Sequence, residues 1–312
     1  MSKKNTAFGI VAVLLWGSNM GFSRILLESL GPFMTSSIEM LFSGWVLILL
    51  MLIQRKSITS LLQLPKAYLI SCSILFTINH LALNYGIALC ENRSQILIIT
   101  ALNYLWPILT IIVSIPILKN RFRKIYFYAG VVITVFSTSY ISLQGGSLDP
   151  RSIFSDRSWI AYLSTFIAAV DWAFYSAFVT KFLAGREKSE TALPLFMLFD
   201  GMIALILSLV FREKSNWTIE IWFPLLYTIV FPSLLAYLFW DLGISRGNSN
   251  LVRFFSLFTV VLSTISSSVI LKIPLRWDVV LCSFLLFLGA YVTQKSILNR
   301  GHEKVNSRQT GE

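Results

Sequence analysis

The stretch SQILIITALNYLWPILTIIVSIPIL, residues 94–118, contains no charged side chain. A transmembrane helix needs about 20 consecutive, mostly apolar residues, so this stretch is long enough to cross a bilayer. It nevertheless carries Asn103, Tyr104, Trp106 and Pro107 near its centre. Polar, aromatic and helix-breaking residues at that depth are more typical of a cavity wall than of a lipid-facing surface. The stretch therefore predicts a membrane helix that borders a cavity, with a kinked packing helix as the alternative.

The composition of the whole chain also indicates a membrane protein. Of its 312 residues, 55% are hydrophobic and 13% are charged, and the mean hydropathy is +0.71. Soluble domains carry about 25% charged residues, so a soluble fold and a disordered chain are both excluded. The net charge of +11 is typical of the basic cytoplasmic ends of bacterial membrane helices, and no nucleic-acid partner is expected. The three cysteines have no C-x-x-C spacing, which indicates neither a metal site nor a disulfide framework.

Ten apolar stretches are long enough to span a bilayer. We predict an all-α protein with spans at 6–27, 32–53, 67–89, 94–118, 125–143, 158–181, 192–211, 221–245, 251–271 and 277–296. The loops between them are too short for a separate soluble domain. Most of the 26 basic residues fall on one side if the N-terminus is inside. This bias predicts a multi-pass protein of the bacterial inner membrane with both termini in the cytoplasm.

Ten spans divide into two halves of five, and an odd number per half gives the second half the opposite orientation. Trp16 and Trp172 are separated in the sequence by nearly the same distance as Gly86 and Gly243. Apolar helices also resemble one another by chance, which is the alternative explanation. We predict two inverted repeats, at 6–143 and 158–298, around a central cavity near the membrane midplane. Such halves rock about the site to expose it to alternate sides.

Several ionisable or polar side chains fall well inside predicted spans. Glu39, Asp171 and Asp200 are costly at this depth unless they are paired or hydrated. Each could bind a proton, pair with a substrate ammonium or anchor the structure. His80 and Asn84 share a helix face, and His80 is either a pathway residue or a hydrogen-bonded packing residue.

These residues resemble a known family of transporters. The ten spans, Trp16-Gly17-Ser18-Asn19 and the sequence Asn103-Tyr104-Leu105-Trp106-Pro107 resemble the drug/metabolite transporter superfamily of the EamA type. Within it the chain looks most like the bacterial aromatic amino-acid exporters. The family fold is two inverted five-helix halves around an aromatic-lined cavity. The resemblance implies Tyr85, Tyr104, Trp106, Pro107 and Trp172 as cavity residues, with His80 close by.

The sequence departs from the family pattern at two places. Residues 258–263 in the ninth span contain no proline, where the family usually has one that matches Pro107. Glu39 stands where the family often has an arginine. The departures concern the substrate range more than the fold.

The function predicted from these observations is export of aromatic amino acids or related small metabolites by alternating access. Aromatic rings hold a flat ring by offset or edge contacts and an ammonium over a ring face. The same rings could hold a cationic drug such as a quaternary ammonium compound, or another small metabolite, so these remain alternatives. A nucleotide-sugar carrier is disfavoured because no basic residue is placed clearly at mid-span.

An intramembrane enzyme is disfavoured because the buried acids lie on separate helices without a catalytic motif. No cofactor or metal is expected, and the expected partners are a small-molecule substrate and the lipid bilayer. The oligomeric state stays open, and a monomer is compatible with the sequence. The candidate coupling residues are Glu39, Asp171 and Asp200. The candidate substrate-binding residues are Asn19, His80, Tyr85, Asn103, Tyr104, Trp106, Pro107, Trp172 and Tyr175.

Overall fold

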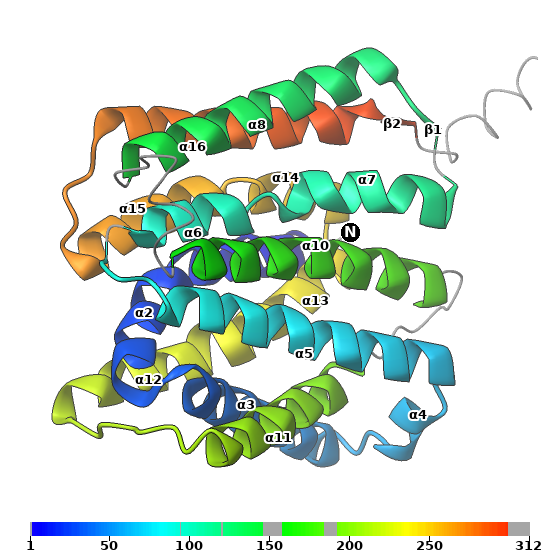
Figure 1. Cartoon of the computed structure of the whole chain (residues 1–312). Coiled ribbons are helices and arrows are strands. Elements are labelled where there is room, and N and C mark those ends of the chain that lie inside the picture. Colours follow the sequence, from blue (N-terminus) through cyan, green and yellow to red (C-terminus); the bar gives the residue numbers. More distant parts are fainter. Residues whose placement is uncertain (1, 94, 120, 146–157, 184–191, 299–312) are drawn as a thin grey trace, which may run out of the picture.

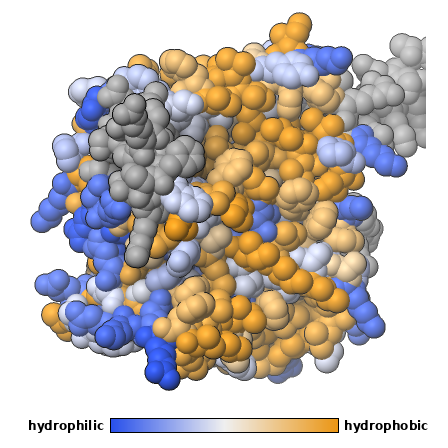
Figure 2. Space-filling view, in the orientation of Figure 1, coloured by the Kyte–Doolittle hydropathy of each residue, from blue (hydrophilic) through white to orange (hydrophobic). Residues whose placement is uncertain are grey.

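The structure is a computed structural model that describes residues 2–93, 95–119, 121–145, 158–183 and 192–298. Within these residues, nine helical segments are long and apolar enough to cross a membrane. The bent pair of α1 (Lys3–Gly17) and α2 (Asn19–Leu30) makes a tenth. The predicted all-helical architecture with ten spans is therefore confirmed. Apolar surface covers the middle of the visible face, and hydrophilic residues lie mainly towards the helix ends (Figure 2).

The helices follow the predicted spans closely (Figure 1). The first half continues with α3 (Pro32–Ile53), the short α4 (Thr59–Leu62), α5 (Lys66–Ala88), α6 (Gln95–Asn103), α7 (Trp106–Leu118) and α8 (Lys124–Gly145). The second half contains α10 (Ser158–Leu183), α11 (Leu193–Val210), a 3-10 turn at Ile219–Ile221, α12 (Trp222–Thr228), a π-helical segment at Ile229–Leu235, α13 (Ala236–Arg246), α14 (Ser249–Ser256), α15 (Thr259–Leu271) and α16 (Trp277–Ser296). Two short strands, β1 (Arg121–Phe122) and β2 (Ile297–Leu298), pair antiparallel and were not predicted. Ser94, the predicted first residue of the fourth span, lies outside the described residues.

Three of the spans are interrupted. The first bends by 41° at Ser18, between α1 and α2. The fourth breaks between α6 and α7, where Pro107 occupies the first turn of α7. This confirms the interruption expected from a residue without a backbone donor. The ninth span breaks at Leu257 and Phe258 although no proline is present there. This span is therefore interrupted without the proline that the family usually has.

Side-chain hydroxyls satisfy the backbone and polar groups at the first break. Ser266 in α15 donates a hydrogen bond to the carbonyl oxygen of Gly17 at 2.5 Å. The hydroxyl of Ser18 bonds to the carbonyl oxygen of Leu15 at 2.8 Å and lies 2.7 Å from the hydroxyl of Tyr227 in α12. A broken helix is tolerated in a bilayer only where neighbouring groups replace the lost bonds, and here both partner helices come from the second half.

The two halves pack against each other reciprocally. A methyl group added to Gly44 in α3 would lie 2.9 Å from Leu198 in α11, and one added to Gly201 in α11 would lie 2.7 Å from Leu41 in α3. Since the earlier residue of each helix meets the later residue of the other, α3 and α11 are antiparallel.

The helices α8 and α16 repeat this arrangement. An added methyl group on Gly130 would lie 2.6 Å from the carbonyl oxygen of Gly289, and one on Gly289 would lie 3.0 Å from the carbonyl oxygen of Gly130. Figure 1 shows α8 beside α16 and α3 beside α11. Reciprocal antiparallel pairs are what two halves of opposite orientation produce. The division at 6–143 and 158–298 stays a prediction.

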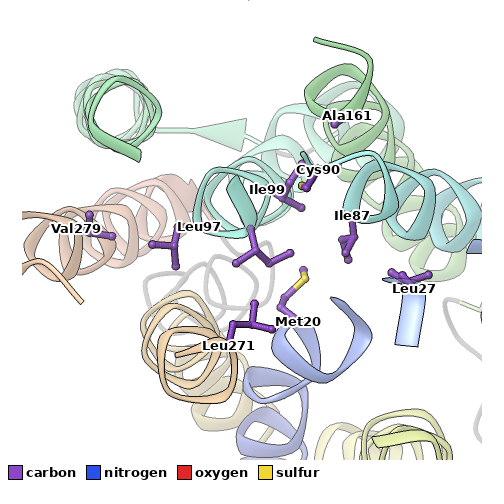
Figure 3. Packing of buried hydrophobic residues seen from close by; sticks show 10 residues of the cluster. Met20, Leu27, Ile87, Cys90, Leu97, Ile99, Ala161, Leu271 and Val279 are labelled. Carbon is purple, nitrogen blue, oxygen red and sulfur yellow. The ribbon is translucent and has the colours of Figure 1, made fainter. Parts of the chain in front are cut away.

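Two apolar clusters lie towards opposite ends of the bundle. In one of them, Met20, Ile87, Leu97 and Leu271 meet from α2, α5, α6 and α15 (Figure 3). In the other, residues from the beginning of α5 pack against α11 and α10; its members include Tyr68, Cys72, Phe76, Phe196 and Met197. Since Ile87 is near the end of α5 and Tyr68 near its beginning, the two clusters mark opposite ends of this helix, and each contains residues of both halves. We call these the Ile87 end and the Tyr68 end.

Gly130→Leu and Gly289→Leu are expected to destabilise the protein because each added side chain meets backbone of the counterpart helix. Overpacking of this kind costs about 1–3 kcal/mol. Thermal unfolding of the purified variants in one detergent measures the effect. The control is Val132→Leu on the same helix as Gly130, where the side chain is 66% exposed. Equal unfolding temperatures for all three variants would contradict the close approach of α8 and α16.

Candidate functional site

A line of aromatic rings crosses from the first half to the second. The ring of Trp106, at the start of α7, lies edge-on to the ring of Trp172 in α10, with centroids 6.4 Å apart. Trp172 stacks on Tyr175, one turn further along α10, at 5.0 Å. The break before α7 places Trp106 at the beginning of a new helix, and the spacing of Trp172 and Tyr175 puts them on one face of α10. These three predicted site residues are brought together.

The aromatic contacts continue towards α1 through α5 and α13. Tyr175 lies 5.9 Å from Phe76 in α5, and Phe76 lies 6.3 Å from Tyr237 in α13. Tyr237 is 5.2 Å from Trp16 in α1. The rings therefore link helices of both halves.

The indole of Trp16 is fixed by the π-helical segment. Its Nε1 donates a hydrogen bond of 3.0 Å to the carbonyl oxygen of Pro232, which lies within Ile229–Leu235. A π-helical turn is rare, and such turns are frequent at functional sites. The irregular backbone thus supplies an acceptor to a side chain of the other half.

Three ionisable side chains meet near the middle of the spans. His80 Nδ1 in α5 lies 2.7 Å from Asp200 Oδ2 in α11, and His80 Nε2 lies 3.8 Å from Glu39 Oε2 in α3. Asp200 is fully buried, and Glu39 is nearly so. We call Glu39, His80 and Asp200 the His80 triad. The sequence placed the three residues well inside predicted spans but did not show that they meet.

Two polar side chains of the first half complete the surroundings of His80. Asn84 Nδ2, one turn along α5, lies 3.2 Å from His80 Nε2. The same amide donates a hydrogen bond of 2.8 Å to Ser36 Oγ in α3. The predicted pairing of His80 and Asn84 on one helix face is therefore observed.

Asp171 is buried in α10, away from any partner that the structure describes. Its Oδ2 atom has no hydrogen-bond partner among the described residues. Among the described hydrogen bonds and ion pairs, none joins Asp171 to the His80 triad. The three acids that the sequence grouped as coupling candidates therefore separate into a pair bridged by His80 and one isolated carboxylate.

The remaining candidate residues occupy varied positions. Asn19 accepts a hydrogen bond of 3.2 Å from Ser23. Asn103 and Pro107 flank the break in the fourth span, and Tyr104 packs against the apolar cluster that includes Ala101 and Val260. Tyr85 lies apart, 38% exposed and stacked on Phe33 at 6.1 Å. A role for these residues in substrate binding stays a prediction.

A buried arginine at the Ile87 end was missed by the sequence reasoning. Arg24 donates hydrogen bonds to the carbonyl oxygens of Ile87 and Cys90, the latter at 2.8 Å, and pairs with Glu28 at 2.9 Å. Glu28 also pairs with Arg93 at 2.7 Å, and this hydrogen bond raises the pKa of Arg93. The spacing of Arg24 and Glu28 along one helix face was the available signal.

An acid of the second half also holds the first half at this end. The carboxylate of Glu213, which follows α11, accepts hydrogen bonds from the backbone N–H of Met34 at 2.6 Å and of Phe33 at 3.3 Å. These are unpaired donors of the first turn of α3. Gly31 precedes them with φ of 83°, a conformation that favours glycine. The Glu213 carboxylate therefore caps a helix of the opposite half.

No group of three or more His, Cys, Asp or Glu side chains is arranged to hold a metal ion among the described residues. The geometry is instead that of a membrane protein with rings and buried acids between two packed halves. Residues 4–143 and again 159–294 match the EamA-like transporter family, and the chain belongs to that family. The predictions of a transporter and of a protein that is not an enzyme are confirmed, and the double match agrees with two repeated halves.

Similar proteins include several bacterial transporters. The aromatic amino acid exporter YddG of Salmonella typhimurium (strain 14028s / SGSC 2262) is 28% identical over 286 residues, which cover 89% of this chain and 92% of the relative. The protein of the same name from Escherichia coli (strain K12) is 26% identical over 279 residues, covering 88% and 92%. The uncharacterized transporter YyaM of Bacillus subtilis (strain 168) is 28% identical over 199 residues, covering 59% of each chain.

A solved crystal structure shares the fold. It superposes with a TM-score of 0.69 at 20% sequence identity and covers 95% of this chain and 98% of the other. At this identity the likeness supports the arrangement of the helices alone.

Arg24→Gln is expected to loosen the Ile87 end because the carbonyl groups of Ile87 and Cys90 lose a buried, charged donor. Losing a hydrogen bond to a charged group costs about 1.5–3 kcal/mol. We expect the buried thiol of Cys90 to react several-fold faster with a maleimide when Cys72 and Cys282 are replaced by serine. Arg93→Gln is the control, since an exposed ion pair contributes about 0–1 kcal/mol. Unchanged Cys90 labelling in Arg24→Gln would contradict an anchoring role for Arg24.

Proposed function

We propose that this chain exports aromatic amino acids or related small metabolites across the bacterial cytoplasmic membrane. The observation that carries the proposal is the contact of Trp106 with Trp172 and of Trp172 with Tyr175 between the two halves. Two curated relatives that align over most of this chain are named aromatic amino acid exporters. The basic residues and the bacterial relatives support the cytoplasmic membrane as the location, with both termini on the cytoplasmic side.

The proposed substrate site combines rings with polar groups. An indole or phenyl ring of the substrate would stack on, or lie edge-on to, Trp106 and Trp172. Its carboxylate would accept hydrogen bonds from Asn19 or Asn103, and its ammonium would lie over a ring face. These two amide side chains belong to the first half, whereas Trp172 and Tyr175 belong to the second. Substrate binding would therefore depend on how the halves lie against each other.

Transport in this proposal is alternating access between the two ends. The reciprocal contacts of α3 with α11 and of α8 with α16 join the two halves closely. The Ile87 end and the Tyr68 end are both filled by side chains in this structure. Opening one end while the other stays packed would require the halves to rock, as in transporters built from inverted repeats. The halves at 6–143 and 158–298 are the proposed moving units.

Export of cationic drugs is the second candidate. It is favoured by one observation, the buried carboxylate oxygens of Glu39, Asp171 and Asp200 that have no hydrogen-bond partner among the described residues. A quaternary ammonium ion needs negative charge and ring faces rather than hydrogen-bond donors. Competition of such a compound with an aromatic amino acid in one assay distinguishes the two candidates.

Trp106→Ala and Trp172→Ala are expected to lower tryptophan flux in reconstituted liposomes. Each variant loses a ring contact worth about 0.5–1.5 kcal/mol beyond its buried area. From this contact alone, tryptophan flux at low substrate concentration should fall by about twofold to tenfold. Trp45→Ala is the matched control because Trp45 is 63% exposed on α3.

The same assay tests the assignment of the site and the identity of the substrate separately. Normal flux in well-folded Trp106→Ala and Trp172→Ala would contradict the site assignment. A wild-type protein that carries a quaternary ammonium compound but no aromatic amino acid would contradict the substrate and favour the second candidate.

A further inference from the structure

The His80 triad lies across the boundary between the halves. Glu39 in α3 and His80 in α5 belong to the first half, and Asp200 in α11 belongs to the second. The imidazole thus stands between two carboxylates that move with different halves if the halves rock. Glu39 Oε1 and Asp200 Oδ1 are both buried without a hydrogen-bond partner among the described residues. Each carboxylate therefore keeps an acceptor that the surrounding protein does not satisfy.

One ring nitrogen of His80 has two alternative hydrogen-bonding arrangements. Nδ1 is committed to Asp200 at 2.7 Å. Nε2 lies 3.2 Å from the amide nitrogen of Asn84 and 3.8 Å from Glu39 Oε2. In a neutral ring with its proton on Nδ1, the Nε2 lone pair accepts from the Asn84 amide. When Nε2 binds a proton, that bond is replaced by donation towards Glu39. A single proton therefore decides which contact Nε2 makes.

The charges around the triad favour binding of a cation. Two carboxylates face one imidazole, and a neutral imidazole leaves the negative charge uncompensated in a low-dielectric region. On the packed helices, α13 packs Tyr237 against the apolar cluster of the Tyr68 end. Helix α10 places the ring of Tyr175 6.3 Å from that of Phe196, one turn from Asp200. The described basic side chain of α2, Arg24, is committed to carbonyl groups at the Ile87 end. A proton on Nε2 supplies the missing positive charge.

We propose that Glu39, His80 and Asp200 form one exchangeable proton site that couples export to proton entry. The proton binds the Nε2 lone pair from water on the outer side, and the imidazolium then bridges Glu39 and Asp200. This bridge stabilises the packed arrangement of the halves. A substrate between the halves requires that packing to open, so substrate and proton are bound alternately. When a substrate enters from the cytoplasm, Nε2 releases the proton to water on the cytoplasmic side and becomes a lone-pair acceptor again. Transport is antiport when the two ligands bind in turn and the halves rock only with one of them bound, and the exclusive binding supplies the negative coupling between the two. This inference rests on the proposed function.

The test uses the full chain in liposomes that contain valinomycin and equal potassium concentrations on both sides, so that no membrane potential develops. Radiolabelled tryptophan is followed under two conditions: equilibrium exchange without a gradient, and accumulation when the vesicle interior is one pH unit more acidic. One proton exchanged per substrate supports accumulation of up to about tenfold for that gradient. The variants are Glu39→Gln and Asp200→Asn. The matched control is Glu220→Gln, an exposed acid in the 3-10 turn.

We expect the wild-type protein and Glu220→Gln to exchange and accumulate tryptophan. Glu39→Gln and Asp200→Asn should still exchange it but lose accumulation. Wild-type exchange without accumulation, or accumulation only in vesicles with an alkaline interior, would overturn antiport and leave the proposed function standing. Accumulation retained by both variants would overturn the site. No wild-type exchange would overturn the proposed function and the coupling together.

A second measurement does not depend on the variants. Tryptophan added to the wild-type protein in weakly buffered detergent solution should release about one proton per substrate bound, followed with a pH-sensitive dye. If the variants fail to fold, this release decides the question: a substrate that binds without proton release overturns the proposal.

Discussion

Inside a bilayer, backbone N–H and C=O groups have no water to bind, so every interruption of a helix must be satisfied by another part of the chain. The bend at Ser18 and the π-helical segment at Ile229–Leu235 follow that constraint. The carbonyl oxygen of Gly17 is bonded by Ser266, and that of Pro232 is bonded by the indole of Trp16. In both cases donor and acceptor belong to different halves. The irregular backbone that shapes the region between the halves is thus also part of what holds them together.

The same constraint explains why the buried ionisable groups other than Asp171 are paired. Asp200 has His80 as its partner, and Arg24 is surrounded by carbonyl oxygens at the end of α5. A lone charge at this depth would be costly, and pairing across helices makes its stability depend on helix position. Features that look like structural anchors in one arrangement of the halves are therefore sensitive to any movement between them. The contacts that stabilise the fold are therefore also the ones that a movement between the halves would change.

The spans could be predicted from the sequence because each is a long apolar run, and Pro107 marked the break before α7. The break at Leu257 and Phe258 has no such marker, because neither proline nor glycine lies at that point of the sequence. Trp106, Trp172 and Tyr175 were predicted as site residues, and they meet. The bridging of Glu39 and Asp200 by His80 could not be predicted, since contacts between helices far apart in the sequence leave no periodic pattern. The family resemblance indicated the fold but not these contacts.

The reciprocal contacts of Gly44 with Leu198 and of Gly201 with Leu41 have an evolutionary consequence. A single five-helix chain that inserted in both orientations would make this pair of contacts with a second copy of itself. Every side chain of such a dimer would occur twice. By the same correspondence, the position equivalent to Glu39 is Phe196, and the position equivalent to Asp200 is Ser43. Joining the two copies into one polypeptide therefore permits a single, unduplicated acidic cluster inside an otherwise symmetric framework.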